Sequence, residues 1–123
     1  MLGTSPLMAF VATRDANRAR TFYRDTLGLI LIADEPYALV FDAMGTTLRV
    51  QKVETLTPAP HTVLGWRVLD ITMAVRTLAA KGIAFERYGF LEQDKDGIWK
   101  TPSGAKVAWF RDPDGNVLSL TEA

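Results

Sequence analysis

The amino-acid sequence predicts an α+β fold in which two βαβββ modules form an incomplete barrel around a cup. The order strand, helix, three strands occurs twice along the chain. Each predicted helix follows an aspartate and ends at a glycine, from Asp15 to Gly28 and from Asp70 to Gly82. Three consecutive strands after each helix favour two sheets with a helix on one face over a parallel βαβ sheet. Each sheet would then keep its other face free.

The first module is predicted over residues 6–54 and opens with an apolar strand over 7–13. Asp15 is the expected N-cap of the helix that follows, because aspartate accepts hydrogen bonds from the free N–H groups of a first turn. Gly28 ends that helix. Apolar side chains recur at helical spacing at Ala16, Ala19, Phe22, Tyr23 and Leu27, and strands are predicted over 29–33, 37–42 and 47–53.

The second module is predicted over residues 61–122, after a linker at about 54–60 that contains two prolines. A strand over 62–68 leads to a helix capped by Asp70, with an apolar stripe at Ile71, Ala74, Val75 and Leu78. Strands are then predicted over 83–88, near 97–100, over 105–111 and over 116–120. The charged segment 91–97 is expected to be a solvated loop, with a mobile lid as the alternative. The two modules together are expected to make one domain over residues 1–123.

Composition excludes several function classes. The 123-residue chain has a formal net charge of zero and a pI near 6.6, so it lacks the basic excess that nucleic acids and anionic membranes attract. It has no cysteine, which excludes disulfides, thiol nucleophiles and thiolate metal sites. The opening "MLGTSPLMAF" has no secretory signal pattern, and no apolar run is long enough to span a bilayer. We therefore expect a soluble, cytoplasmic protein.

The C-terminal segment predicts a hairpin with one free face. The sequence Asp112-Pro113-Asp114-Gly115 is a strong turn signal, and residues 116–121 alternate as a half-buried strand does. Its two leucines, Leu118 and Leu120, are expected in the core. Val117, Ser119 and Thr121 then share the opposite face.

Two stretches of this chain resemble the vicinal oxygen chelate superfamily, which includes glyoxalase I, extradiol dioxygenases and bleomycin-resistance proteins. They are "RDANRARTFYRDTLGL" in the first helix and "FRDPDGNVLSL" in the last hairpin. The resemblance implies that the free sheet faces line the cup, where enzyme members hold a divalent metal. Ligands in such members come from the first and last strands of each module. In this sequence the corresponding positions are Met8, Arg49, Val63 and Ser119.

These four side chains are poor metal ligands. Hard and borderline cations favour carboxylate and imidazole donors, whereas an arginine stays positively charged. An alignment shift of two residues would offer Thr47, Gln51, Val117 or Thr121, which do not restore a three-ligand site. His61 is the only histidine and is more often a polar strand-edge residue than a ligand. We therefore predict no metal, no cofactor and no catalytic residue.

Strand alternation predicts a mostly apolar cup with a few polar groups, which is typical of a small-molecule site. The cup face also includes Ala12, Gly65 and Val117, and Trp66 is expected in the core. Trp99 is expected either to stack on a planar ligand or to pack at a subunit interface. The alternative is that these residues simply fill the barrel and that Arg49 pairs with an acid such as Asp42 or Glu54. The predicted ligand-binding residues are Met8, Phe10, Thr47, Arg49, Gln51, His61, Val63, Trp99, Trp109, Ser119 and Thr121.

The function that best fits these features is metal-independent binding or sequestration of a small organic molecule, neutral or anionic, with a bleomycin-resistance-like architecture. One alternative is a glyoxalase-like lyase or isomerase, or a dioxygenase-related enzyme, with a divergent or misassigned active site. A third is an inactive scaffold, which a filled barrel and a paired Arg49 would favour. The resemblance implies a homodimer.

Overall fold

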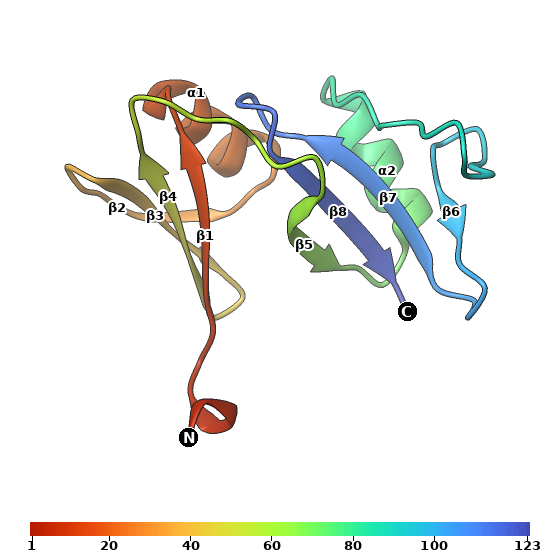
Figure 1. Ribbon diagram of the computed structural model, residues 1–123, viewed down its shortest axis with the longest axis horizontal. Coiled ribbons are helices and arrows are strands. Elements are labelled where there is room, and N and C mark those ends of the chain that lie inside the picture. Colours follow the sequence, from red (N-terminus) through yellow and green to blue (C-terminus); the bar gives the residue numbers. More distant parts are fainter. The chain divides into compact units, whose positions relative to one another are not determined.

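The structure, a computed structural model, describes residues 1–123. The chain forms two compact units, Met1–Thr57 and Pro58–Ala123, each with one four-stranded sheet (Figure 1). The boundary between the units falls within the proline-containing segment that the sequence marks as a linker. No helix has the length and apolar character that a membrane span requires.

The first unit has the predicted βαβββ order. After a short 3₁₀ turn, η1 (Leu2–Thr4), its elements are β1 (Met8–Thr13), α1 (Ala16–Arg20), the π-helical turn η2 (Thr21–Thr26), β2 (Ile30–Asp34), β3 (Ala38–Ala43) and β4 (Thr46–Lys52). The strands lie in the order β1-β4-β3-β2, with β1 parallel to β4 and the other neighbours antiparallel.

The second unit repeats this topology. Its elements are β5 (Thr62–Arg67), α2 (Ile71–Ala80), β6 (Trp99–Lys100), β7 (Lys106–Arg111) and β8 (Val117–Glu122). The strands lie in the order β5-β8-β7-β6, and β5 is parallel to β8 as β1 is to β4. The predicted α+β fold with two repeated modules is confirmed.

Each helix begins at the predicted cap. The Asp15 carboxylate accepts a hydrogen bond from the Arg18 backbone N–H at 3.1 Å, and Asp70 accepts one from the Met73 N–H at 3.0 Å. In the first unit the helix widens into η2 before Gly28, whose φ of +79° ends it.

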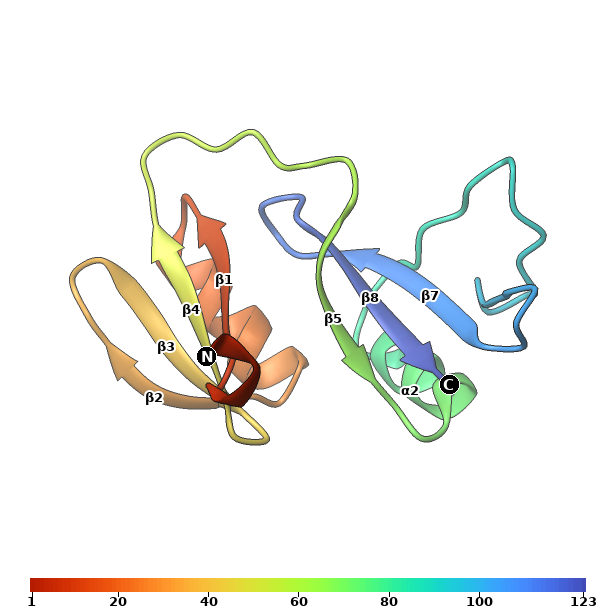
Figure 2. The ribbon, with the colours of Figure 1, turned by 60° about the horizontal axis from the view of Figure 1, so that its bottom comes forward.

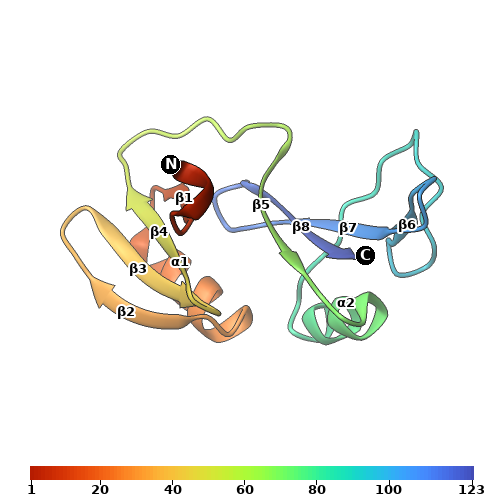
Figure 3. The same cartoon turned by 90° about the horizontal axis from the view of Figure 1, so that it is seen from below.

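Both helices cover one face of their own sheet. In the first unit the Tyr23 ring lies 5.9 Å from that of Phe41 on β3, and both residues are fully buried. In the second unit Figures 2 and 3 show α2 along one side of β8 and β7. Ile71 and Val75 of α2 are buried on that side with Phe110 of β7. The opposite face of each sheet is called its open face below.

The strand predicted over residues 83–88 is wrong. This segment has no strand structure, and the sheet ends with the short β6. The Gln93 side chain takes the place of a strand partner there. Its carbonyl oxygen accepts from the Tyr88 backbone N–H at 2.8 Å, and its amide donates to the carbonyls of Glu86 at 2.9 Å and Gly97 at 2.8 Å. The Gln93 side chain thus forms hydrogen bonds with backbone groups that a neighbouring β-strand would otherwise pair.

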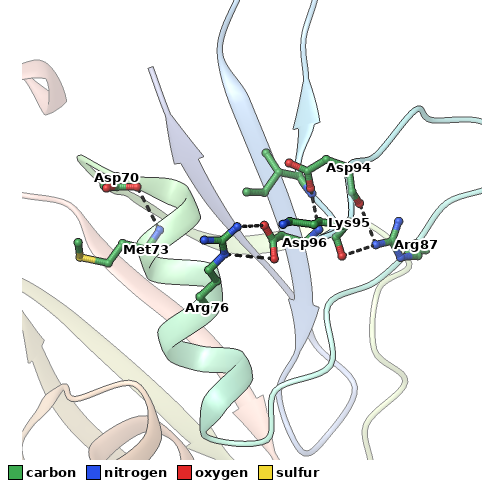
Figure 4. A network of polar contacts seen from close by, with 8 residues as sticks. Asp70, Met73, Arg76, Arg87, Asp94, Lys95 and Asp96 are labelled. Atoms are coloured by element: carbon green, nitrogen blue, oxygen red, sulfur yellow. Dashed lines mark hydrogen bonds and ion pairs between the residues drawn. The ribbon is translucent and has the colours of Figure 1, made fainter.

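The charged loop over residues 91–97 is held in place by an ion pair and by hydrogen bonds (Figure 4). Arg76 of α2 forms an ion pair with Asp96 at 3.1 Å. The Arg87 guanidinium donates to the backbone carbonyls of Asp94 at 2.8 Å and Lys95 at 2.9 Å. Within the loop, the Asp94 carboxylate accepts from the Asp96 and Ile98 backbone N–H groups, both at 2.9 Å. These contacts fit an ordered surface loop better than a lid.

Candidate functional site

The open face of the first sheet carries the residues that alternation places there. In the register, Met8 pairs with Thr47, Phe10 with Arg49, and Ala12 with Gln51. The residues between them, such as Val11 and Leu48, are buried on the helix face. All six residues therefore share the face opposite the buried one, as alternation predicts.

Apolar side chains are exposed on this open face. Met8 is 52 % and Phe10 is 50 % exposed. Ile30 on β2 is 63 % exposed and pairs with Asp42, which pairs in turn with Thr47. The face therefore presents apolar surface interrupted by a few polar groups, which is the composition of many small-molecule sites.

Arg49 is ion-paired, and its partner is Glu35 rather than the Asp42 or Glu54 that the sequence suggests. The Arg49 Nη1 atom lies 3.1 Å from Glu35 Oε1, and both side chains are partly exposed. Glu35 follows β2, which is an edge strand two strands away from β4. Such a long-range contact depends on strand order, which spacing along the chain does not specify.

A second group of charges lies beside this pair. The Asp34 carboxylate accepts hydrogen bonds from Lys52 at 2.5 Å and from Arg20 at 2.6 Å. The hydrogen bond from Lys52, followed by that from Arg20, lowers the pKa of Asp34 below its ordinary value. Asp34 is therefore ionised at neutral pH and holds both cations.

On the open face of the second sheet, Ser119 of β8 occupies the middle of a cross-strand row. It pairs with Trp109 of β7 on one side and with Gly65 of β5 on the other. The Ser119 hydroxyl lies directly over Gly65, because a Cβ atom added to Gly65 would be 2.6 Å from Ser119 Oγ. The absence of a side chain at Gly65 thus leaves room for the Ser119 side chain.

The Trp109 indole lies across β8. Its Nε1 donates to the Thr62 hydroxyl on β5 at 3.1 Å, although Trp109 and Thr62 lie on opposite sides of β8. An indole in this position covers the open-face side chains of β8. It accounts for the low exposure of Val117 (1 %) and Ser119 (9 %) on a face that the helix does not cover.

Further aromatic side chains surround Trp109. The Trp99 ring is stacked on it, with centroids 6.1 Å apart and an interplanar angle of 29°. The Tyr88 ring meets it edge-on at 5.4 Å, and Phe90 lies 5.8 Å from Tyr88. Phe90 is 84 % exposed. Trp109, Trp99, Tyr88 and Phe90 are called the aromatic cluster below.

The environment of Tyr88 favours its neutral form. Partial burial, with a smaller contribution from the negative charge of Glu86, raises the pKa of Tyr88 above its ordinary value, and Arg111 opposes this shift. The phenol therefore offers a hydroxyl group rather than a charge at neutral pH.

The remaining predicted residues are less well placed. Thr121 lies on β8, paired with Val107 and Arg67, and is half-buried. Val63 lies in a β-bulge, because the register passes from Thr62 to Leu64. His61 precedes β5 and is exposed. The bulge breaks the alternation that linked His61, Val63 and Gly65 to one face.

Sequence reasoning missed four contributors to these faces: Glu35, Thr62, Tyr88 and Phe90. The aromatic pair "YGF" close to Trp99 was a usable signal, but the strand expected over 83–88 obscured it. Nothing in the sequence indicates that Thr62 contributes to this face, because its position next to the Trp109 indole depends on the bulge at Val63.

The residues at the four metal-ligand positions do not fit a divalent cation. They offer a thioether at Met8, a guanidinium at Arg49, an isopropyl group at Val63 and a hydroxyl at Ser119. The Arg49 charge would repel the ion and is already engaged by Glu35. The structure contains no group of three or more His, Cys, Asp or Glu residues arranged to hold a metal.

Solved structures of similar fold cover nearly the whole chain. A lactoylglutathione lyase from Agrobacterium tumefaciens is 18 % identical with a TM-score of 0.75, covering 98 % of this chain and 94 % of that chain. A glyoxalase/bleomycin resistance protein/dioxygenase superfamily member from Sphaerobacter thermophilus DSM 20745 is 25 % identical with a TM-score of 0.76, and each chain is covered fully, 100 %. TnmS3, an antibiotic binding protein from Streptomyces sp. CB03234, is 26 % identical with a TM-score of 0.73, covering 99 % and 98 %.

No functionally curated protein matches the chain significantly. The sequence profile of one family, described as Glyoxalase/Bleomycin resistance protein/Dioxygenase superfamily, matches residues 6–120. This match includes both helix caps and the final hairpin on which the resemblance rests. The chain therefore belongs to the Glyoxalase/Bleomycin resistance protein/Dioxygenase superfamily.

Proposed function

We propose that this protein binds a small organic molecule on the open faces of its sheets without a metal ion. The observation that carries the proposal is the aromatic cluster, in which rings on an uncovered sheet face are held in place but remain partly exposed. Such rings provide apolar contact area and flat surfaces for a planar ligand. The similarity to TnmS3, described as an antibiotic binding protein, supports the same class of function.

The open face of the first sheet offers a separate set of contacts. Met8 and Phe10 offer apolar surface, and Thr47, Gln51 and the Arg49–Glu35 pair offer polar groups to orient a ligand. Because Glu35 balances the charge of Arg49, a neutral ligand fits this face better than an anion. We propose a homodimer as the assembled form.

Metal independence is the second part of the proposal. It rests on the chemistry of the donors at Met8, Arg49, Val63 and Ser119, which are the positions implied by the family resemblance. A metal-free reaction would need a proton acceptor beside the ligand. Of the two carboxylates on the open face of the first sheet, Asp42 and Glu35, the second is engaged by Arg49, so the superfamily's lyase and dioxygenase chemistry is the weaker alternative.

An inactive scaffold is the other candidate, and the ion pair of Arg49 favours it. A scaffold has no need of exposed rings beside a polar row, however, and Phe90 and Phe10 both remain exposed. Whether the purified protein contains a bound ligand distinguishes small-molecule binding from a scaffold role directly.

Native mass spectrometry of protein purified without added metal tests the proposal. We expect a dimer mass with no stoichiometric metal and with an organic adduct that is released on denaturation. A stoichiometric divalent metal that survives desalting would overturn metal independence. A protein free of adducts that also binds no member of a broad metabolite and antibiotic library would support the scaffold instead.

A further inference from the structure

Glu35 is a carboxylate placed against the one arginine of the first sheet's open face. Its Oε1 lies 3.1 Å from Arg49 Nη1, although Glu35 follows β2 and Arg49 lies on β4, two strands that are not neighbours. Asp42 lies on the same open face, paired with Thr47, but Glu35 is the carboxylate that contacts the guanidinium. A ligand that reaches Arg49 therefore also meets Glu35.

The backbone around Glu35 is held firmly. The Glu35 N–H donates to the Ala38 carbonyl at 2.9 Å, and the Lys52 ammonium donates to the Glu35 carbonyl at 2.8 Å. The Lys52 backbone N–H also donates to the Tyr37 carbonyl at 2.8 Å. These bonds attach the turn between β2 and β3 to β4. The backbone that carries the Glu35 carboxylate is therefore held in a fixed position relative to Arg49.

The local charges are almost balanced. Arg20 and Lys52 share the Asp34 carboxylate, and Arg49 has Glu35. On the open face, Glu35 balances the charge of Arg49, and Asp42 adds a second carboxylate. Removing the Glu35 charge would leave the Arg49 guanidinium as an open anion site.

We propose that Glu35 is a specificity-determining residue that keeps anions away from Arg49 and selects uncharged ligands. An anion that approaches the remaining N–H groups of Arg49 is repelled by the Glu35 carboxylate, which lies 3.1 Å from Arg49 Nη1. A neutral amide can accept from the guanidinium through its oxygen and donate to the carboxylate through its N–H, so it uses the pair intact. This inference rests on the proposed function and names the ligand class for that site.

Two probes of equal shape test the proposal: 1-naphthamide, which is neutral, and 1-naphthoate, which is an anion. Each is titrated into ¹⁵N-labelled protein while the amide resonances of β1 and β4 are followed. We expect wild type to bind the naphthamide more tightly. Glu35→Gln should bind the naphthoate about fivefold tighter, the upper range for exposed ion pairs, with the naphthamide affinity little changed. Adding Arg49→Met to Glu35→Gln should remove the gain.

Asp25→Asn is the matched control. Asp25 also pairs with an arginine in the first unit, Arg24 at 2.8 Å, and its loss changes the net charge equally. A similar gain in Asp25→Asn would assign the effect to net charge and overturn the role of Glu35. So would an unchanged naphthoate affinity in Glu35→Gln when the naphthamide still binds. Binding of neither probe to any variant would count against the open face as a ligand surface, and thus against the proposed function itself.

Discussion

Gly65 and Ser119 show how a single missing side chain shapes the open face of the second sheet. The serine hydroxyl occupies the space above Gly65 Cα, and the Trp109 indole covers the serine from the other side. The backbone at Gly65 does not have a positive φ, so steric space rather than conformation explains the glycine.

Gly65→Ala should therefore destabilise the protein by about 1 kcal/mol, because the new methyl group forces Ser119 out of its rotamer against the indole. In a Ser119→Ala background the same change should be neutral or slightly stabilising, since alanine suits a strand better than glycine and the nearest obstructing atom is gone. Urea unfolding of the four proteins measures both effects. Equal costs in the two backgrounds would show that Ser119 does not explain Gly65.

The ion-pair partners of charged residues are harder to predict from the sequence than the positions of apolar residues. Arg49 was expected on the open face and lies there, but its partner Glu35 is 14 residues away along the chain, farther than the suggested Asp42 and Glu54. Ion pairs between partly exposed side chains contribute little to stability, and the sequence pattern gives little indication of which residues form them.

At the level of elements, the segment from α2 to β6 differs from its counterpart in the first unit. The first unit has a full strand, β2, after its helix, whereas residues 83–98 follow an irregular course. Gln93 is the side chain that makes this course possible, because it satisfies three backbone groups.

Gln93→Met should destabilise the protein by about 2–3 kcal/mol, because a side chain of similar length leaves the Tyr88 N–H and two carbonyls without partners. It should also speed hydrogen exchange at the Tyr88 amide and disturb the aromatic cluster. Glu92→Met, at the adjacent exposed position, is the control and should change neither quantity. Unfolding titrations and amide exchange measure the pair. Unchanged protection at Tyr88 in Gln93→Met would contradict this account.

For the whole molecule, the question that separates the candidate functions is whether folding or binding involves a metal ion. Solved structures of similar fold include proteins described as a lyase and as an antibiotic binding protein. The fold alone does not choose between such roles. Our proposal of metal independence rests instead on the donor chemistry at Met8, Arg49, Val63 and Ser119.

EDTA should leave the melting temperature of the purified protein within about 1 °C of its starting value, because a ligand stabilises a fold only when it binds the native state. Adding Zn²⁺, Mn²⁺ or Ni²⁺ in turn should not raise it. Calcium-saturated EDTA is the matched control for effects of the chelator itself. A clear fall in melting temperature with EDTA, reversed by one of these ions, would contradict metal independence.

The sequence by itself determined the repeat and the secondary structure apart from residues 83–88. Local signals specify these features: Asp15 and Asp70 as caps, Gly28 and Gly82 as helix ends, alternation of less and more buried residues in β1 and β4, and alternation of apolar and polar residues from Leu118 to Thr121. The same alternation was enough to put Met8, Phe10, Arg49 and Ser119 on open faces. Periodicity and capping depend on near neighbours in the chain, so they can be read without coordinates.

Only the tertiary structure decided which of these residues act together. The bulge at Val63 brings Thr62 to the Trp109 indole, Gln93 replaces a strand over 83–88, and Glu35 reaches Arg49 across the sheet. The bulge and the Glu35 contact depend on register and strand order between segments that are not adjacent in sequence, whereas Gln93 contacts backbone groups only 4 to 7 residues away. One extra residue in a strand reverses the face of everything beyond it, and no local pattern records that shift.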